Sequence, residues 1–420
     1  MLLQFSVENF LSFRDKAVFN LTPSKDKLHP NNVVKVGNFS ALNTISITGA
    51  NASGKSNLLK AVLIAFNMVR NSNMLQPIDK LPYMPFKFDK DSDKMPTSFE
   101  FVFVGEDSNK YVYGFSYLSD RIVDEYLYVY SSRRPTLIFD RTNTTEYEFT
   151  TTQKKALNPL TAITSDNKLF LCTSSAWNNP VSGEVTKWIL EKINIISDIN
   201  ALNNVALEIY KTDSENNSKE NLNFASKLLQ SADINISNID VEFRETPTEM
   251  MPRIMFNDVA LQPSKSFQIE AVTTHTVIND NSEEQYQMNL GEESSGTQQL
   301  FFLAPLIKKI LDHGEILFID EIEKGLHPFI VNSLIDVFRD ENLNPKRAQL
   351  IFTTHNTSLL DLDIFRRDQV YFAEKDSDTA VSTLYSLSEF SVRNTEDIQK
   401  GYLLGRYGAI PNIKGDLFNV

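Results

Sequence analysis

Alternating hydrophobic and polar residues run through much of the first 140 positions and predict β-strands. Leu3, Phe5 and Val7 alternate with polar neighbours, which is the pattern of a half-buried strand. Residues 17–21 follow as its partner across a turn. The alternation repeats between 97 and 139 and predicts an antiparallel meander. The alternating aromatic residues there are Phe99, Phe101, Phe103, Tyr111, Tyr113, Phe115, Tyr126, Tyr128 and Tyr130.

Longer hydrophobic periods predict helices in the rest of the chain. An apolar stripe marks a helix at 56–70, and helical patterns at 184–231, interrupted by a polar break at 213–219, indicate a small helical insertion. An apolar helix is expected at 300–311, with Pro305 kinking or restarting it. Short buried strands lie between helices further on, which is the α/β pattern. These strands are predicted at 316–319, 350–353 and 370–372, and a short β-branched strand is predicted earlier, at 44–48.

Composition and charge narrow the class of protein. The 420 residues are 41% hydrophobic, enough to bury a sizeable core. The balance of 41 basic against 54 acidic residues gives −13, which argues against a simple basic sleeve for nucleic acid. Cys172 is the only cysteine, so no disulfide forms within the chain. The start is not that of a signal peptide, and no run approaches the roughly 20 apolar residues of a membrane span. A cytoplasmic protein is expected.

The segment GANASGKS at 49–56 fits the pattern G-x-x-x-x-G-K-[ST], a phosphate loop when it joins a strand to a helix. Gly49 and Gly54 permit a tight turn with N–H groups pointing inward, and the helix N-terminus favours anions. Lys55 is expected on the β- and γ-phosphates, and the Ser56 hydroxyl on Mg²⁺. A chance glycine turn is the weaker interpretation. The predicted nucleotide-binding residues here are Gly49, Asn51, Ser53, Gly54, Lys55, Ser56 and Asn57.

Two acids, Asp320 and Glu321, directly follow a buried strand. Ligands of open α/β sheets bind at the carboxyl ends of strands. We predict that Asp320 holds Mg²⁺, through water, and that Glu321 acts as the general base on the attacking water. Acids at this position could instead serve a helix dipole, but the phosphate loop favours the catalytic interpretation.

His355 follows another buried strand and offers a hydrogen-bond donor for the γ-phosphate. A capping or core histidine is the plain alternative. The segment ESSGTQQ at 293–299 precedes the apolar helix, and a Ser-Gly turn at a helix N-terminus is a second anion-binding surface.

The order of these motifs resembles that of the ABC ATPases, and within them the SMC, RecF-type and OLD-like branch. The opening NFLSF at 9–13, followed by Arg14, is similar to the start of those proteins, whereas the signature departs from L-S-G-G-Q. PFKFD at 85–89, SGT at 295–297 and GRYGAIP at 405–411 resemble stand-alone bacterial ATPases of the RloA/AbiL type. That type is linked with phage defence and abortive infection, often beside a separate nuclease-like protein.

The resemblance implies a fold and a division of the chain. The fold is α/β, an ABC-type ATPase head with a mixed or parallel P-loop sheet, an antiparallel β lobe, a small helical insertion and no long coiled coil. Residues 1–183 would form the N-terminal part of the head, 184–232 the insertion and 233–420 the C-terminal part.

The resemblance also implies an ATP-dependent homodimer, in which Lys55 and Ser56 face Ser294 and Gly296 of the partner subunit. Such a two-fold arrangement is the commonest oligomer symmetry, and bound ATP would favour the closed state. The loop at 325–327 would touch the partner's site. Arg14 would contact a phosphate or the adenine, with a solvated surface arginine weighed equally.

Other roles stay open. No Gln is obvious as the metal-sensing residue, and Gln76 and 85–89 are the regions to suspect. Glu374, Asp376 and Asp378 superficially resemble the metal-binding acids of OLD-type nucleases, but a charged turn is preferred. No nuclease or membrane domain is evident, so the output is expected to pass to a separate effector, a nuclease or toxin. The alternatives are a RecF/SMC-like DNA-binding ATPase in repair and a nucleotide-sensing scaffold that barely hydrolyses ATP.

Overall fold

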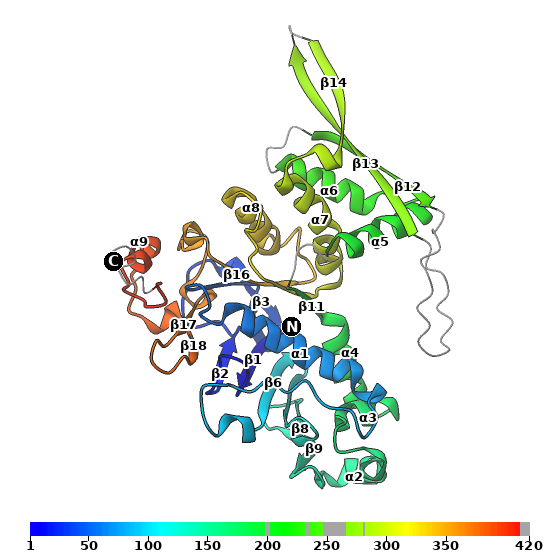
Figure 1. Cartoon of the computed structure of the whole chain (residues 1–420), viewed down its shortest axis with the longest axis vertical. Helices are drawn as coiled ribbons and strands as arrows, with labels where there is room; N and C mark the ends of the chain where they lie inside the picture. The colour runs from blue at the N-terminus through cyan, green and yellow to red at the C-terminus, as the bar shows by residue number, and fades with distance from the viewer. Residues whose placement is uncertain (198–201, 232–235, 247–265, 280–281, 412–420) are drawn as a thin grey trace, which may run out of the picture. The chain divides into compact units, whose positions relative to one another are not determined.

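The computed structural model describes residues 1–197, 202–231, 236–246, 266–279 and 282–411, and these residues fall into two compact units (Figure 1). Unit 1 comprises Met1–Ser197, Ile310–Lys324 and Leu334–Val420, and unit 2 comprises Asp198–Lys309 and Gly325–Ser333. Compactness thus divides the chain after 197, 309, 324 and 333, whereas the divisions expected from the sequence fall after 183 and 232.

Unit 1 contains a mostly parallel sheet with the strand order β11-β15-β16-β5-β17-β18. β5 lies between β16 and β17, parallel to both, and all its residues are buried. The buried strands predicted here are confirmed. The sequence pattern does not predict β11, because its short run follows a helix inside an apparently helical segment. The bounds are β5 Thr44–Thr48, β11 Ile193–Ile196, β15 Ile316–Ile319, β16 Gln349–Thr354, β17 Val370–Lys375 and β18 Ser382–Ser386.

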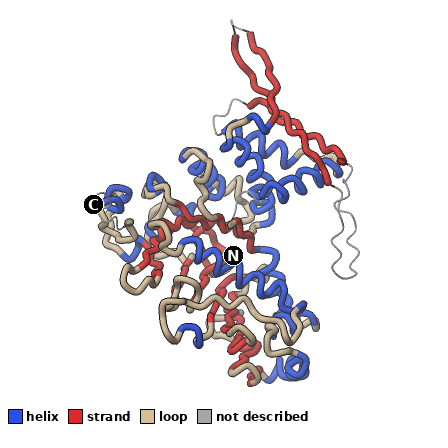
Figure 2. Tube along the Cα trace, in the orientation of Figure 1, coloured by secondary structure: helices blue, strands red, loops and turns tan. Residues whose placement is uncertain are grey.

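Unit 1 also contains an antiparallel sheet with the order β10-β9-β8-β7-β6-β1-β2. The predicted meander and the predicted pairing of the first strand with 17–21 are confirmed by the register. Figure 2 shows the strands in red. The bounds are β1 Leu2–Glu8, β2 Ala17–Asn20, β6 Thr97–Val104, β7 Lys110–Tyr117, β8 Ile122–Tyr130, β9 Thr136–Thr142 and β10 Glu146–Phe149.

A hydrophobic cluster joins the two sheets of unit 1 to helix α1, Lys55–Asn71. Phe5 and Phe101 come from the antiparallel sheet, Ile47 and Phe318 from the parallel sheet, and Leu59 from α1. Because close-packed cores resist deformation, this cluster gives the glycine loop between β5 and α1 a rigid base. The other helices and strands of unit 1 are β3 Val33–Val36, β4 Phe39–Leu42, α2 Thr151–Leu157, α3 Phe170–Ala176, α4 Pro180–Lys192 and α9 Ile398–Leu403. Helix α8, Pro328–Arg339, begins in unit 2 and continues into unit 1 from Leu334.

Unit 2 combines short helices with a sheet of order β12-β13-β14. The expected helical pattern is present, and the polar break at 213–219 falls at the turn between α5 and α6. The described residues form the mixed α/β fold that the sequence implied, and their helices in this unit are too short for a long coiled coil. The bounds are α5 Leu202–Glu215, α6 Glu220–Ser231, β12 Ile236–Thr246, β13 Ser266–Asn279, β14 Ser282–Asn289 and α7 Ser295–His313.

Helix α7 does not restart at Pro305, contrary to one of the two outcomes expected from the sequence. The helix is continuous from Ser295 to His313. Proline lacks the N–H that would bond the carbonyl four residues earlier. That carbonyl, of Phe301, instead accepts a hydrogen bond from the Tyr210 hydroxyl at 2.8 Å. The helix therefore tolerates Pro305 because a neighbouring side chain satisfies the acceptor it leaves.

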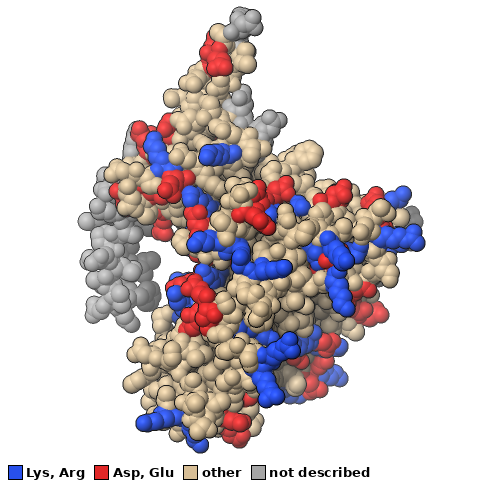
Figure 3. Space-filling view, turned by 180° about the vertical axis from the view of Figure 1, so that it is seen from behind, with Lys and Arg blue, Asp and Glu red and all other residues tan. Residues whose placement is uncertain are grey.

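Among the described residues, no helix is long and apolar enough to cross a membrane. On the face drawn in Figure 3, basic and acidic side chains are intermixed rather than gathered into one basic stripe.

Candidate functional site

The glycine loop is shaped by two positions that have no room for a side chain. A Cβ on Gly49 would come within 2.2 Å of the Ala373 carbonyl oxygen, and a Cβ on Gly54 within 2.6 Å of Ser382 Oγ. Gly54 also has φ of 115°, in the region that favours glycine. The loop can therefore pack against β17 and β18 and turn sharply into α1, which leaves backbone N–H groups at the helix N-terminus for an anion.

Lys55 lies inside this loop. Its ammonium group donates to the carbonyl oxygens of Gly49 at 2.7 Å and Ala50 at 3.0 Å, and the residue is 5% exposed. Burial lowers the pKa of Lys55 to about 8, while the carboxylates of Asp320, Glu321 and Glu323 act in the opposite direction. The structure thus brings the loop lysine within electrostatic reach of the acids after β15.

The acids after β15 are held by the neighbouring strand. The Thr353 hydroxyl donates to Asp320 Oδ1, and the Glu321 N–H donates to Thr353 Oγ1 at 2.8 Å. Glu321 has φ of 51°, unusual for a residue with a side chain. Backbone strain of this kind persists only where surroundings impose it, and it clusters at functional sites. Glu321 keeps 45% of its side chain exposed, so its carboxylate remains accessible to water.

His355 lies beside Glu321, as predicted for neighbouring strand ends. Its Nε2 is 3.6 Å from Glu321 Oε1. Its own N–H donates to Glu323 Oε1 at 2.5 Å. The other oxygen of Glu323 is buried and has no hydrogen-bond partner in the described part of the chain. Sequence reasoning missed Glu323 and Thr353; the signal for Glu323 was a third acid in DEIE at 320–323.

The remaining loop residues offer hard oxygen and amide groups. Ser53 Oγ is buried and unpaired within the described residues, so it is available to a ligand. Asn57 donates instead to Ser12 Oγ at 2.8 Å, and Ser56 opens α1 beside Lys55. Among the described residues, no group of three or more His, Cys, Asp or Glu side chains is placed to hold a metal ion. The Ser56 hydroxyl and the Asp320 carboxylate suit Mg²⁺, which takes few protein ligands and keeps water and phosphate oxygens.

Arg14 lies in a turn that contacts one of the two suspected metal-sensing regions, 85–89. Arg14 donates to the adjacent Asp15 and is exposed. Ser12 of the same turn accepts from Ser382 N–H through its carbonyl at 2.7 Å. The segment 85–89 is tied to this turn because Phe86 N–H donates to Asn9 Oδ1 at 3.1 Å. Gln76 bonds Asp79 and Asn167 through its backbone, and none of its described bonds reaches the loop.

The signature segment belongs to unit 2 and begins α7. Ser294 is exposed, and its hydroxyl accepts the Thr297 N–H at 3.1 Å, which is an N-cap arrangement. A Cβ on Gly296 would come within 2.7 Å of the Gly325 carbonyl oxygen, so the signature turn and the loop at 325–327 are in contact. The carboxylate of the preceding residue, Glu293, accepts hydrogen bonds from His275 at 2.7 Å and from Thr273 at 2.5 Å. These bonds fix the signature segment to β13.

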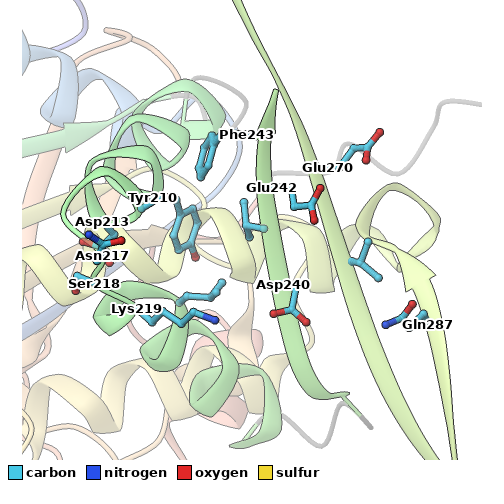
Figure 4. Close-up of a pocket in the computed structure, with 14 residues that line it drawn as sticks. Tyr210, Asp213, Asn217, Ser218, Lys219, Asp240, Glu242, Phe243, Glu270 and Gln287 are labelled. Carbon is cyan, nitrogen blue, oxygen red and sulfur yellow. The ribbon is translucent and has the colours of Figure 1, made fainter. Parts of the chain in front are cut away.

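Two pockets differ in their relation to these residues. A pocket of about 1130 Å³ in unit 1 is lined by Gly49, Asn51, Ser53 and His355, and by residues of the segments 374–377 and 409–411. A pocket of about 650 Å³ in unit 2 lies between α5, α6 and the sheet (Figure 4) and contains none of the predicted site residues. The first pocket is therefore the one that belongs to the candidate nucleotide site.

The acids at 374–378 lie at the end of β17 and in the turn to β18, and two of them accept hydrogen bonds there. Asp376 accepts from the backbone of Asp378 and Thr379, and Glu374 accepts from the Tyr385 hydroxyl. The charged turn stays the prediction for these acids.

Comparison with known proteins places the chain in a family. No curated protein matches it. Among solved structures, the SMC head domain from Thermotoga maritima is 12% identical, with 92% of this chain and 98% of that chain covered and a TM-score of 0.43. The SmcHead bound to the C-winged helix domain of ScpA is 15% identical, with 92% and 97% covered and a TM-score of 0.43. The recombination mediator RecF with ATP is 14% identical, with 92% and 99% covered and a TM-score of 0.36.

These identities and TM-scores are too low to carry an argument about function. The match to a family model, in contrast, covers most of the chain. A model described as "AAA domain, putative AbiEii toxin, Type IV TA system" matches residues 45–361, which include the glycine loop, the acids after β15 and His355. The chain therefore belongs to this AAA_21 family of P-loop ATPases.

Proposed function

We propose that this chain binds and hydrolyses Mg-ATP at a site shared between two copies of itself, and that the nucleotide cycle regulates a separate effector in anti-phage defence. The observation that carries the proposal is the convergence of Lys55, Asp320, Glu321 and His355 at the ends of adjacent strands. The family description, which names a toxin of a type IV toxin–antitoxin system, supports the defence setting.

Each residue has a task in hydrolysis. Lys55 and the loop N–H groups bind and neutralise the phosphates. Glu321, with its exposed carboxylate, accepts the proton of the attacking water, and His355 donates to the γ-phosphate while contacting Glu321. Ser56 and Asp320 would hold Mg²⁺, which neutralises phosphate charge when bound. Ser294 and Gly296 of the partner subunit would complete the site.

The biochemical test compares phosphate release and ATP binding in purified variants. Lys55→Ala should lose both, because the buried positive charge is removed. Glu321→Gln should keep binding and lose turnover by about 10²–10⁴-fold, the usual contribution of general-base catalysis. Lys60→Ala, an exposed lysine on the same helix, is the matched control and should leave both unchanged. A wild type that ignores Mg-ATP, or a Lys55→Ala variant that matches it, would contradict the proposal.

The defence role needs a cellular test. Cells that carry the protein with its neighbouring gene should resist phage, and Lys55→Ala should restore plaque formation while the protein is still made. The repair alternative predicts ATP-dependent binding to duplex DNA with strong salt dependence. The intermixed charges in Figure 3 offer it no support. A gel shift with and without ATP separates the two.

A further inference from the structure

The segment GRYGAIP at 405–411 lies directly against the glycine loop. The Ala409 carbonyl accepts a hydrogen bond from the Ala50 N–H at 3.0 Å. That N–H belongs to the same peptide group as the Gly49 carbonyl, which accepts from Lys55 Nζ at 2.7 Å. A single peptide plane therefore has Lys55 on one side and Ala409 on the other.

Ala409 is itself closely fixed. It is 1% exposed, and its φ of 56° lies in the left-handed region that residues with side chains rarely adopt. Its carbonyl also accepts from the Tyr402 hydroxyl at 2.9 Å, and its N–H donates to Glu374 Oε1 at 3.0 Å. Such a conformation persists only when the surroundings impose it.

Glu374 links Ala409 to the sheet. Its second oxygen accepts from the Tyr385 hydroxyl at 2.9 Å, and that hydroxyl is 2.8 Å from the Tyr407 carbonyl. A Cβ on Gly408 would come within 2.6 Å of the same hydroxyl and 2.9 Å of Glu374 Oε2, so only glycine fits there.

Aromatic packing adds a second attachment between the segment and β17. The Phe372 ring stacks with Tyr402 at 5.7 Å and with Tyr407 at 5.8 Å between ring centroids. The C-terminal segment is thus held to β17 both by the Phe372 ring and by Glu374.

We propose that Glu374 and the segment 405–411 position Lys55 for phosphate binding, acting through Ala409 and the Gly49–Ala50 peptide group. Hydrogen bonds in a chain strengthen and orient one another, so Ala409 fixes the direction of the Gly49 carbonyl that holds Lys55. Glu374 lines the same pocket as the glycine loop, but its hydrogen bonds go to Ala409 and Tyr385 and none goes to Lys55, so we assign it a positioning role. The inference rests on the proposed ATP binding and adds to it a second, distant part of the chain.

The role of Glu374 depends on its hydrogen bonds rather than on its charge. A glutamine at 374 can accept from Ala409 N–H with its oxygen and donate to the Tyr385 hydroxyl with its amide. Tyr385 can then donate to the Tyr407 carbonyl. An alanine at 374 leaves the Ala409 N–H without its acceptor and frees the segment to move away from Ala50.

The experiment measures the Kd of Mg-ATP and the phosphate-release rate for Glu374→Ala and Glu374→Gln. We expect about tenfold weaker binding for alanine, the order expected for losing one well-placed hydrogen bond, and less than about a twofold change for glutamine. Glu389→Ala is the matched control, because Glu389 caps the nearby Ser386 N–H at 2.8 Å without touching Ala409. Its thermal midpoint should fall, whereas its Kd should match that of the wild type.

Equal losses in the alanine and glutamine variants, or wild-type affinity in Glu374→Ala while Lys55→Ala fails to bind, would overturn the inference. If Glu374→Ala does not fold, Tyr402→Phe decides, because it removes one hydroxyl donor from the Ala409 carbonyl and keeps the ring. About threefold weaker binding is then expected, and unchanged affinity would overturn the inference. A wild type that binds no ATP would instead remove the proposed function, so the two failures are distinguishable.

Discussion

Lys55 is a base whose charged form is disfavoured by its own surroundings until a ligand arrives. Burial lowers its pKa to about 8, against the attraction of Asp320, Glu321 and Glu323. Triphosphate would add several negative charges beside the ammonium group and raise its pKa again. Binding should therefore draw a proton from solution whenever the pH is near or above 8, and affinity should fall as pH rises through that value.

Calorimetry in buffers of different ionisation enthalpy tests this directly. At pH 8.5, a group with a pKa of about 8 is mostly neutral, so Mg-ATP binding should take up roughly three-quarters of a proton. At pH 7 the uptake should shrink to about a tenth of a proton. Lys55→Arg, which stays charged, should bind without uptake at either pH. Equal uptake by Lys55→Arg and the wild type would assign the proton to another group.

A buried carboxylate in the antiparallel sheet provides a stability test at the same scale. Glu125 is fully buried and accepts from the N–H groups of Phe170 at 2.6 Å and Leu171 at 2.8 Å, while Arg141 lies 3.8 Å away. Burial raises the pKa of Glu125. Glu125→Ala leaves these donors and Arg141 uncompensated and should lower the free energy of unfolding by about 3–5 kcal/mol. Urea unfolding measures it, and the exposed Glu148→Ala is the control that should change little.

The residues whose placement follows from local sequence were the ones that could be predicted to lie together. The glycine loop, Asp320, Glu321 and His355 each follow a recognisable strand, so their convergence needed only the rule about strand ends. Thr353 and Ala409 were missed because their importance comes from partners about 33 and 359 positions away, which no local pattern encodes.

At the scale of elements, the loop between β5 and α1 depends on two glycines whose surroundings leave no room for a methyl group. Gly54→Ala should abolish ATP binding, because the new Cβ would meet Ser382 Oγ at 2.6 Å at an unfavourable φ. Gly183→Ala in α4 is the matched control, since its Cβ would meet nothing within 4 Å. It should raise stability by up to about 1 kcal/mol through helix propensity. ATP binding and thermal unfolding of both variants check this, and normal binding by Gly54→Ala would contradict the loop geometry.

Elements were predicted well where hydrophobic periods were long or strongly alternating. The meander and the buried strands followed from such periods. β11 was missed because INII after a helix has no period of its own, and it becomes a strand through pairing with β15. The continuity of α7 through Pro305 depended on Tyr210, which lies 95 positions earlier in the sequence.

For the whole molecule, the central prediction is ATP-dependent dimerisation. Glu321→Gln with Mg-ATP should elute as a dimer in size-exclusion chromatography with light scattering, because the closed state forms and is not hydrolysed. Without nucleotide it should be monomeric. Ser294→Arg added to Glu321→Gln should bind ATP and remain monomeric, since a bulky cation would occupy the surface facing the partner's phosphate. Ser294→Ala, which loses the cap without adding bulk, should still dimerise. A dimer with the arginine variant would exclude this interface.

The strand order of the parallel sheet has a consequence for how the protein is made. β5 is complete after residue 48, but both of its neighbours, β16 and β17, lie about 300 residues further along the chain. At ribosomal rates of about 5–20 residues per second, the edges of this strand, which is wholly buried in the finished fold, wait roughly 15–60 s for their partners. The backbone N–H and C=O groups of β5 therefore lack their strand partners for most of the synthesis, and such unpaired edges can pair with other chains. Ribosome-associated chaperones, rather than the finished fold, would guard the strand during that interval.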